Sequence, residues 1–598
     1  MATSNKDIQE ATVSHHDQAQ AHPETELFRE VVLGHDFTVD SAELPKGYFR
    51  GLPFLGSMFA IGVSYGAGVG GFAFAAPILA NIDADIGPSP NLTWVALTYT
   101  LTTAIGLMVV GRLTDLFGRR WFMIGGNVFG LLGTIVCATA KTIDAMIAGE
   151  TLIGLGASAQ LSFAFTINEL VPFKYRFLAN GYIYIWGTVC SGIGPVIAYA
   201  FVYKTSVGWR GVFYLLIAMN AVGLACWYFF YHPPNFNMKH GPGRKMQFVR
   251  EFDYIGTLMA ILGFLLFLMG LSWGGGLYPW KSAHVVATIV VGFLLLVTFI
   301  LYETFMPLKE PLIPVHLFRN RGLVISIALW SIGASVYYAF AIVWPTMVVV
   351  LYAPAHANDP MWTGYAALAL NGGISFGELV GSWPRKWIHH QIRAVFFIGS
   401  VLLAATASCT ADTPGRAITL MFLGSMFIGW NEILTSCVAT ICVEDQRELG
   451  TAIGFGGSSR SFVSTICATV YTVILTNRIA TTVPQYVPPA LIAAGLPSSS
   501  VADYFTAFAN GTAAAFATVP GISPTILAAG ERAYQDANAA AYKTVFLCTI
   551  AFSGIGIILS IFCPNIDHLL TDKVTTTLHE SGHEGPITKE AVTGSEAA

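Results

Sequence analysis

Residues 111–120, GRLTDLFGRR, place three arginines and an aspartate between two long apolar runs. The preceding run is LTWVALTYTLTTAIGLMVV (92–110) and the following one is WFMIGGNVFGLLGTIVCATA (121–140). Only 11% of the 598 residues are Asp, Glu, Lys or Arg, whereas a soluble chain has about a quarter. A charged turn between uncharged runs of about 20 residues is typical of a loop joining two membrane-spanning helices.

The composition predicts a membrane protein and excludes several other classes. The chain is 54% hydrophobic with a net charge of −4, which favours lipid as solvent and gives no basis for nucleic-acid binding. The first fifty residues have no apolar segment near Met1, so we expect no cleavable signal peptide. No nucleotide-binding G-x-x-x-x-G-K-[ST] occurs, and the nine cysteines lie in or beside apolar runs at spacings unlike a metal site. We therefore expect no nucleotide, metal or cofactor.

Fourteen segments are long and apolar enough to span a bilayer. They lie at 54–80, 93–111, 121–140, 144–170, 178–203, 207–230, 254–273, 284–304, 323–350, 361–383, 394–411, 417–443, 451–477 and 543–563. The expected fold is an all-α polytopic membrane protein.

Lysine and arginine in the loops predict the orientation. With the N-terminus inside, the inner loops hold sixteen of them and the short outer loops hold four. Both termini are therefore expected in the cytoplasm, and loop 478–542 outside. That loop contains the sequon Asn510-Gly511-Thr512, so Asn510 is a glycosylation candidate.

A polar stretch at 232–253 divides the chain. We expect a cytoplasmic tail (1–50), a six-helix bundle (51–231), the linker (232–253), an additional helix pair (254–305), a second six-helix bundle (306–570) and a cytoplasmic tail (571–598). Many transporters are built from such repeats. The second bundle carries GSWPRKWIHH (381–390) where the first carries residues 111–120, with Arg385 in the position of Asp115.

Residues 111–120 resemble the motif G-x-L-x-D-x-x-G-R-R between helices 2 and 3 of the major facilitator superfamily. The count of fourteen spans resembles its drug:proton antiporter branch. Within that branch the chain resembles fungal trichothecene efflux pumps and the related siderophore transporters, in NIDADIGPSPNLTWVALTYTL (81–101), LIGLGASAQLSF (152–163), ELVPFKYR (169–176) and ELGTAIGFGGSSRSF (448–462). The resemblance implies two six-helix bundles plus the extra pair, and alternating access.

The resemblance also implies a gating role for this loop. Its candidate residues are Gly111, Arg112, Asp115, Gly118, Arg119 and Arg120. A carboxylate at the membrane edge can hold an arginine or cap a neighbouring helix N-terminus, and either contact can break when the halves rock. The alternative is that the arginines only anchor the loop at the inner membrane face, a role to which Asp115 adds nothing.

Ionisable residues deep in a span are functional candidates by default. Glu432 and Arg460 each lie eleven residues from the inner ends of consecutive spans, about 16 Å deep, so they can pair, either structurally or as a proton-responsive pair. Glu150 stands where the antiporter pattern has an arginine, and it either titrates or pairs with a polar neighbour. Glu378 is a weaker proton-coupling candidate because it is near enough to the inner face to reach it.

Span 5 contains GTVCSGIGP (187–195), which predicts close packing at Gly187 and Gly194 and a kink at Pro195. It resembles the antiporter motif that ends in G-P-x-x-G-G, without the final glycines. Aromatic and amide side chains suited to a cavity for a bulky organic molecule are Tyr182, Trp186, Tyr337, Asn371, Trp430 and Asn431.

The leading hypothesis is a secondary transporter, proton-coupled, that exports a bulky secondary metabolite, a trichothecene-like mycotoxin or a drug. Proton-driven uptake of a ferric siderophore is the alternative within the class. A membrane-embedded enzyme would need polar residues clustered at one face, and a channel would not need a repeat with a buried ion pair. The expected partners are the bilayer, protons and a small-molecule substrate. The expected location is the plasma membrane, with a vacuolar or vesicle membrane as the alternative.

Overall fold

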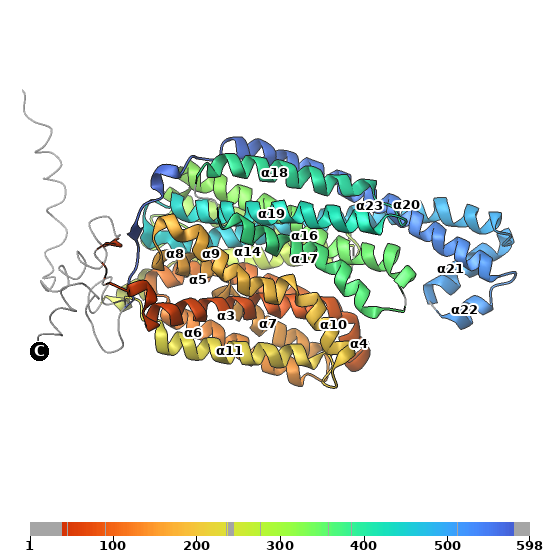
Figure 1. Cartoon of the computed structure of the whole chain (residues 1–598), viewed down its shortest axis with the longest axis horizontal. Coiled ribbons are helices and arrows are strands. Elements are labelled where there is room, and N and C mark those ends of the chain that lie inside the picture. Colours follow the sequence, from red (N-terminus) through yellow and green to blue (C-terminus); the bar gives the residue numbers. More distant parts are fainter. Residues whose placement is uncertain are drawn as a thin grey trace, which may run out of the picture.

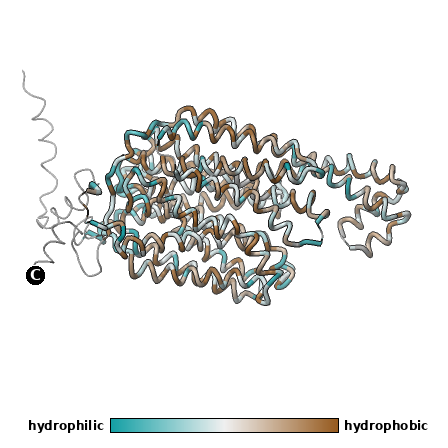
Figure 2. Tube along the Cα trace, in the orientation of Figure 1, coloured by the Kyte–Doolittle hydropathy of each residue, from teal (hydrophilic) through white to brown (hydrophobic). Residues whose placement is uncertain are grey.

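The computed structural model describes residues 39–578 except 43, 45, 90, 235, 237–243, 276, 357, 384–385 and 511. Long helices run side by side in an elongated bundle (Figure 1). Apolar residues cover the middle of the bundle, and hydrophilic residues gather at one end (Figure 2). We call this end, where Gly118 and the strands β1 (Val39–Asp40) and β2 (Lys573–Val574) lie, the motif end. The opposite end is the far end.

The first half of the chain forms a bundle of six membrane-length segments. They are α3 (Leu52–Ala75), α5 (Leu92–Phe117), α6 (Arg120–Thr139), α7 (Ile143–Gln160) with α8 (Phe163–Leu170), α9 (Arg176–Gly187) with α10 (Gly194–Lys204), and α11 (Arg210–Phe230). A π-helical turn, Thr188–Gly192, separates α9 from α10. The short α4 (Leu79–Ile86) follows α3 at the far end.

The second half repeats this arrangement. Its segments are α16 (Arg321–Met347), α17 (Pro360–Gly381), α18 (Ile388–Ala405), α19 (Pro414–Cys442), α20 (Leu449–Ala493) and α23 (Pro524–Ile561). The halves meet along two seams, where α5 packs against α20 and where α9 and α10 pack against α17.

The additional helix pair, α14 (Tyr254–Trp273) and α15 (Ala283–Phe305), lies beside the first seam. α14 contacts both α5 and α20, and Phe264 and Phe267 of α14 pack against the ring of Phe462 on α20. The pair follows the short helix α13 (Lys245–Glu251), which forms inside the expected linker. The pair therefore covers the α5–α20 seam and not the α9–α17 seam.

Eleven helices in the described part of the chain are long and apolar enough to cross a membrane. The remaining three expected spans correspond to α7 with α8, α16 and α17, which are helical in the structure. The two six-helix bundles and the additional helix pair expected from the sequence are thus the arrangement observed.

Segment 478–542 is mostly helix, as its short apolar stretches suggest. α20 continues sixteen residues past 477 and α23 begins nineteen residues before 543, with α21 (Val501–Asn510) and α22 (Ala513–Ala517) at the tip. These segments share a small apolar core around Leu491, Tyr504 and Ile526. This packing sustains α20 through Pro484, Pro488 and Pro489, although an interior proline costs about 3 kcal/mol of helix stability. Asn510 ends α21; its side chain lies outside the described part.

The buried apolar cores show how the halves contact each other. At the motif end one cluster is continuous across both halves and includes Phe177 of α9, Val438 of α19 and Leu449 of α20. Toward the far end each half has a separate cluster, around Phe213 and around Phe340. The halves are therefore closed on each other at the motif end.

Candidate functional site

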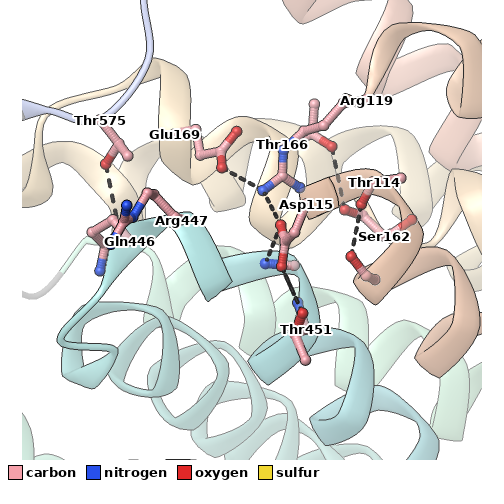
Figure 3. A network of polar contacts seen from close by, with 12 residues as sticks. Thr114, Asp115, Arg119, Ser162, Thr166, Glu169, Gln446, Arg447, Thr451 and Thr575 are labelled. Atoms are coloured by element: carbon pink, nitrogen blue, oxygen red, sulfur yellow. Dashed lines mark hydrogen bonds and ion pairs between the residues drawn. The ribbon is translucent and has the colours of Figure 1, made fainter. Parts of the chain in front are cut away.

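Asp115, in the last turn of α5, caps the first turn of α20 in the other half (Figure 3). One carboxylate oxygen accepts the backbone N–H of Gly450 at 3.0 Å. The other accepts the backbone N–H and the hydroxyl of Thr451 at 2.6 and 2.8 Å. The first N–H groups of a helix have no partner within the helix and form the positive end of its dipole, so a carboxylate is stabilised there. Asp115 therefore joins the two halves at the motif end.

Arg119 connects Asp115 to a second carboxylate. Its Nη2 is 3.1 Å from Asp115 Oδ1, and it forms an ion pair with Glu169 at the end of α8. The guanidinium also lies 4.3 Å from the ring centroid of Phe165. The buried Arg176 lies close enough to Glu169 for charge interaction. The two carboxylates therefore face two guanidiniums, and the N-terminus of α20 adds about half a positive charge beside Asp115.

Glycines allow α5 and α20 to touch backbone to backbone beside this clasp. A β-carbon on Gly111 would lie 2.3 Å from the carbonyl oxygen of Gly450, and one on Gly454 would lie 2.6 Å from that of Leu107. Gly118 is required for a different reason, because its φ is +92° and its ψ is 153° where it ends α5. Side chains other than hydrogen are strained in that region.

The other two arginines of the motif each bind a separate element. Arg112 forms an ion pair with Glu310 at 2.7 Å, in the segment that leads from the helix pair into the second half. Arg120 donates to the carbonyl oxygen of Tyr228, in the last turn of α11, at 2.8 Å, where a cation is favoured by the helix dipole. The motif thus holds α20, the helix pair and α11 at one point.

The second copy of the motif makes different contacts. A β-carbon on Gly381 would clash with Trp430 and Ile433 of α19, which is in the same half. Gly111 instead faces the opposite half. Arg385 lies outside the described residues, so its contacts are not part of this comparison.

Glu432 of α19 and Arg460 of α20 form a partly buried ion pair near the middle of the bundle. Glu378 of α17 lies beside it, close enough for charge interaction with both groups, and is 7% exposed. The sequence left Glu378 free to reach the membrane surface. Instead α17 ends at Gly381, against the middle of α19, so Glu378 is enclosed at the depth of the pair.

Side chains from both halves surround these three charges. Tyr65 of α3 and Tyr184 of α9 are buried and lie near Glu378 and Glu432. From the second half, Trp330 of α16 lies 5.9 Å from the guanidinium carbon of Arg460. Neither amide atom of Asn431 has a hydrogen-bond partner in the described part of the chain, and the same holds for the indole N–H of Trp430. The Asn431 amide lies against Gly333 of α16 and the Trp430 ring against Gly381 of α17, so both side chains lie between helices of the second half.

Glu150 of α7 is 1% exposed, and within the described residues neither carboxylate oxygen has a hydrogen-bond partner. Met146 and Ile153, one turn away on either side, belong to the apolar core of the first half. A carboxylate in such surroundings is strongly disfavoured unless it binds a proton or a cation. Glu150 is distant in the fold from the Glu432–Arg460 pair, because it lies in the far part of α7.

The remaining candidates divide into packing residues and residues near the charge cluster. Gly187 packs against Tyr65, and Gly194 and Pro195 begin α10 directly after the π-helical turn. Trp186 packs between Gly62 and Phe59 of α3, away from the charges. Tyr182 and Asn371 are half-buried on α9 and α17, and Trp430 stacks on Phe427. The side chain of Tyr337 lies outside the described part.

Arg176 is a residue that the sequence-based reasoning counted only as a loop charge. It is fully buried at the start of α9 and donates to the carbonyl oxygen of Thr440 at 2.8 Å and to Gln446 Oε1 at 2.9 Å, both in the second half. Glu169 was likewise missed. The available signal was the pair itself, a carboxylate and an arginine seven residues apart in ELVPFKYR, at the inner end of span 4.

Two six-helix halves that clasp each other at one end and enclose charges at their centre define a secondary transporter of the major facilitator superfamily. The model of one family, described as the fungal trichothecene efflux pump (TRI12), matches residues 28–594. The chain belongs to this family, which confirms the resemblance found in the sequence.

Individual relatives match most of the chain. The trichothecene efflux pump TRI12 of Fusarium sporotrichioides is 29% identical over 550 residues, covering 90% of this chain and 91% of that protein. The MFS-type transporter prx5 of Penicillium rubens is 30% identical over 502 residues, covering 79% and 89%. Among solved structures, the proton:xylose symporter XylE aligns with 88% of this chain and 98% of its own at 12% identity and a TM-score of 0.48.

We predict that Gly111→Ala separates α5 from α20 at the motif end, because the new methyl group meets backbone that cannot rotate away. Overpacking of this kind typically costs about 1–3 kcal/mol. Hydrogen exchange of the first-turn amides of α20, measured by mass spectrometry, should accelerate. Gly415→Ala, whose methyl group meets open space, is the matched control; equal exchange in both variants would contradict the prediction.

Proposed function

We propose that this protein exports a bulky secondary metabolite of the trichothecene-like class, or a drug, in exchange for protons by alternating access. The observation that carries the proposal is the enclosed group of Glu378, Glu432 and Arg460, which faces tyrosines of the opposite half. Membership of the efflux pump family supports the direction and the class of cargo.

The chain is an integral membrane protein of a transporter family. We assign its motif end to the cytoplasm and the protein to the plasma membrane, with both termini inside. The excess of Lys and Arg in the loops at this end supports the orientation. The α20–α23 extension then projects outside.

In this orientation the structure corresponds to the state closed toward the cytoplasm. The Asp115 cap, the Arg119 ion pairs and the apolar cluster around Val438 and Leu449 close the inner side together. Opening inward requires Asp115 to leave the N-terminus of α20. The hydrogen bonds of that contact are either made or broken, so the contact acts as a latch between a closed and an open state.

The central charges supply the coupling to protons. Two carboxylates beside one guanidinium carry a surplus negative charge, and burial of an uncompensated charge is costly. Binding of one proton by Glu378 or Glu432 neutralises the group, and protonation of Glu432 weakens its hold on Arg460. A substrate that fills the space between the halves changes the same balance, so proton and substrate binding are coupled. Glu150 is a second protonation candidate within the first half.

The side chains around the charges suit a bulky, moderately polar molecule. Tyr65 and Tyr184 offer aromatic faces from one half, and Trp330 offers one from the other, beside the charged groups of Glu378, Glu432 and Arg460. Pockets of this composition, mostly apolar with a few polar groups, are typical of small-molecule sites.

Transport measured in both directions tests the proposal. Cells with and without the protein are loaded with labelled trichothecenes or ferric siderophores, and the proton gradient is then collapsed. Export of a trichothecene that stops on collapse is the expected outcome. Gradient-driven accumulation of a siderophore, with no effect on toxin retention, would replace export by uptake.

We predict that Glu432→Gln and Glu378→Gln each change the pH dependence of transport, because each removes one protonatable carboxylate from the central group. The measurement is initial transport rate against pH in proteoliposomes. Glu531→Gln, on an exposed position of α23, is the matched control and should keep the wild-type profile. Unchanged profiles in both central variants would make the Glu432–Arg460 pair purely structural.

We predict that Asp115→Asn reduces transport about tenfold or more while the protein remains in the membrane. The amide loses the charge that the α20 N-terminus and Arg119 stabilise, and a change of about 1.4 kcal/mol in the balance of states is already tenfold. Transport rate and surface abundance are measured together. Asp144→Asn, exposed in the first turn of α7, is the control. Full activity in Asp115→Asn would remove the latch from the mechanism.

A further inference from the structure

The chain after α23 returns across the motif end as an extended segment, Thr571–Leu578, which we call the strap. Its strand β2 pairs antiparallel with β1, Val39 opposite Val574 and Asp40 opposite Lys573. Residues Val574 to Leu578 are all buried, and Val574 and Leu578 are fully inaccessible. A strand on a surface exposes alternate side chains, so five consecutive buried residues indicate that the strap is enclosed on both faces.

The strap is covalently part of the second half but bonds mainly to the first. Its backbone accepts from the N–H of Lys174 at 3.1 Å through Thr571 and donates to the carbonyl oxygen of Glu169 at 2.9 Å through Thr576. Asp572 forms an ion pair with Lys174. The N–H of Leu578 donates to the hydroxyl of Tyr48 at 2.8 Å. These contacts lie on the elements just before α3 and around the α8–α9 turn.

Just before the strap, the chain is held by its own half. Asp567 accepts from the backbone N–H of Trp387, before α18, at 3.2 Å, and Arg393 donates to the carbonyl oxygens of Ser560 and Ile561 at the end of α23. Only a few residues separate this anchor from the contacts with Lys174. Separation of the halves at the motif end must therefore break the contacts of the strap with the first half.

Arg176 joins the strap to both halves. Besides Thr440 and Gln446, its guanidinium donates to the hydroxyl of Thr575 at 3.2 Å. Figure 3 shows Thr575 beside Gln446, where its hydroxyl lies 3.5 Å from Gln446 Oε1. The described residues place only neutral acceptors within hydrogen-bond distance of it, although the guanidinium is fully buried. Glu169 of the first half lies close enough for charge interaction with it, so the attraction to its own half does not depend on the strap, whereas the contacts with Thr440, Gln446 and Thr575 are neutral hydrogen bonds that water can replace. Such a contact suits a part that must open repeatedly.

We infer that the strap is a third component of the inner gate, held by Arg176, which must leave the first half before the cytoplasmic side opens. The inference rests on the proposed alternating access. It assigns to residues 571–578 a control over transport that the motif at 111–120 does not account for.

A native cysteine reports on this gate without any substrate. Cys437 of α19 is fully buried in the apolar cluster that also contains Leu578, and it lies near Arg176. Cys137 of α6 is equally buried but belongs to the far cluster of the first half. Alkylation of Cys437 by N-ethylmaleimide, followed by mass spectrometry, therefore measures opening of the inner side, and Cys137 measures general loosening of the fold.

In the first arm of the test the chain ends after Leu570. We expect alkylation of Cys437 in inside-out vesicles to become about tenfold faster, the shift that about 1.4 kcal/mol produces, with Cys137 unchanged. Unchanged alkylation of Cys437 would overturn the inference. Faster alkylation of both cysteines would mean that the shortened chain is misfolded, and the second arm then decides.

In the second arm the full chain carries Lys174→Cys and Asp572→Cys, linked by a short thiol-specific cross-linker. The link should stop transport and slow alkylation of Cys437, whereas the unlinked double variant and each single variant should remain active. Trp387→Cys with Asp567→Cys, linked within the second half, is the matched control and should transport normally. Normal transport by the chain linked at 174 and 572 would overturn the inference.

The two arms also separate this inference from the proposed function. If the alkylation rate of Cys437 depends on the strap but no trichothecene is transported, the export proposal fails and the inference about the strap stands. If export is proton-coupled but neither the alkylation of Cys437 nor transport by the cross-linked chain depends on the strap, only the inference about the strap fails.

Discussion

The structure depends on one carboxylate at the first turn of a helix that belongs to the other half of the molecule. Asp115 accepts two backbone N–H groups and a hydroxyl from α20, and the glycines at 111, 450 and 454 bring the two backbones close enough for this contact. Arg119 also forms an ion pair with Glu169, and Arg112 forms one with Glu310 beside the helix pair. If the charge is removed, the glycines stay in contact, but the first N–H groups of α20 lose the carboxylate that accepts them.

Much of this arrangement follows from the sequence because helices place residues by simple arithmetic. Glu432 and Arg460 lie at equal depth on consecutive spans, and the structure brings them together. Asp115 was recognisable as a gating residue because a negative charge does not help arginines to anchor a loop at the inner membrane face. In contrast, Glu378 was assigned a position near the surface because the end of α17 depends on how Gly381 packs against α19. Packing between helices remote in sequence leaves no periodic signal.

The contacts that the sequence could not reveal are made by the backbone. The strap bonds to Lys174 and Glu169 through N–H and carbonyl groups, which every residue possesses. Its residues, KVTTTL at 573–578, read as a polar tail. Similarly, the helical extension of α20 contains three prolines, so propensity alone argues for a loop. It persists because Leu491, Tyr504 and Ile526 bury one another.

The two seams between the halves are not equivalent. The helix pair lies over the α5–α20 seam, where α14 packs against both helices, while the α9–α17 seam relies on small residues, with Gly181 against Ser382 and Gly192 against Ser375. Both the helix pair and the Asp115 contact lie at the α5–α20 seam, so the pseudo-symmetry of the two halves is broken at that seam.

The helices that project at the far end have a practical consequence for imaging. α20 extends past residue 477 by sixteen residues, about 24 Å of helix, and it is braced by the first turns of α23 and by its own apolar core. A transporter whose mass lies almost entirely within a detergent micelle gives featureless particles with two look-alike halves. This protein carries a rigid marker on one half only, so its projections can be oriented and its halves told apart without an added antibody fragment.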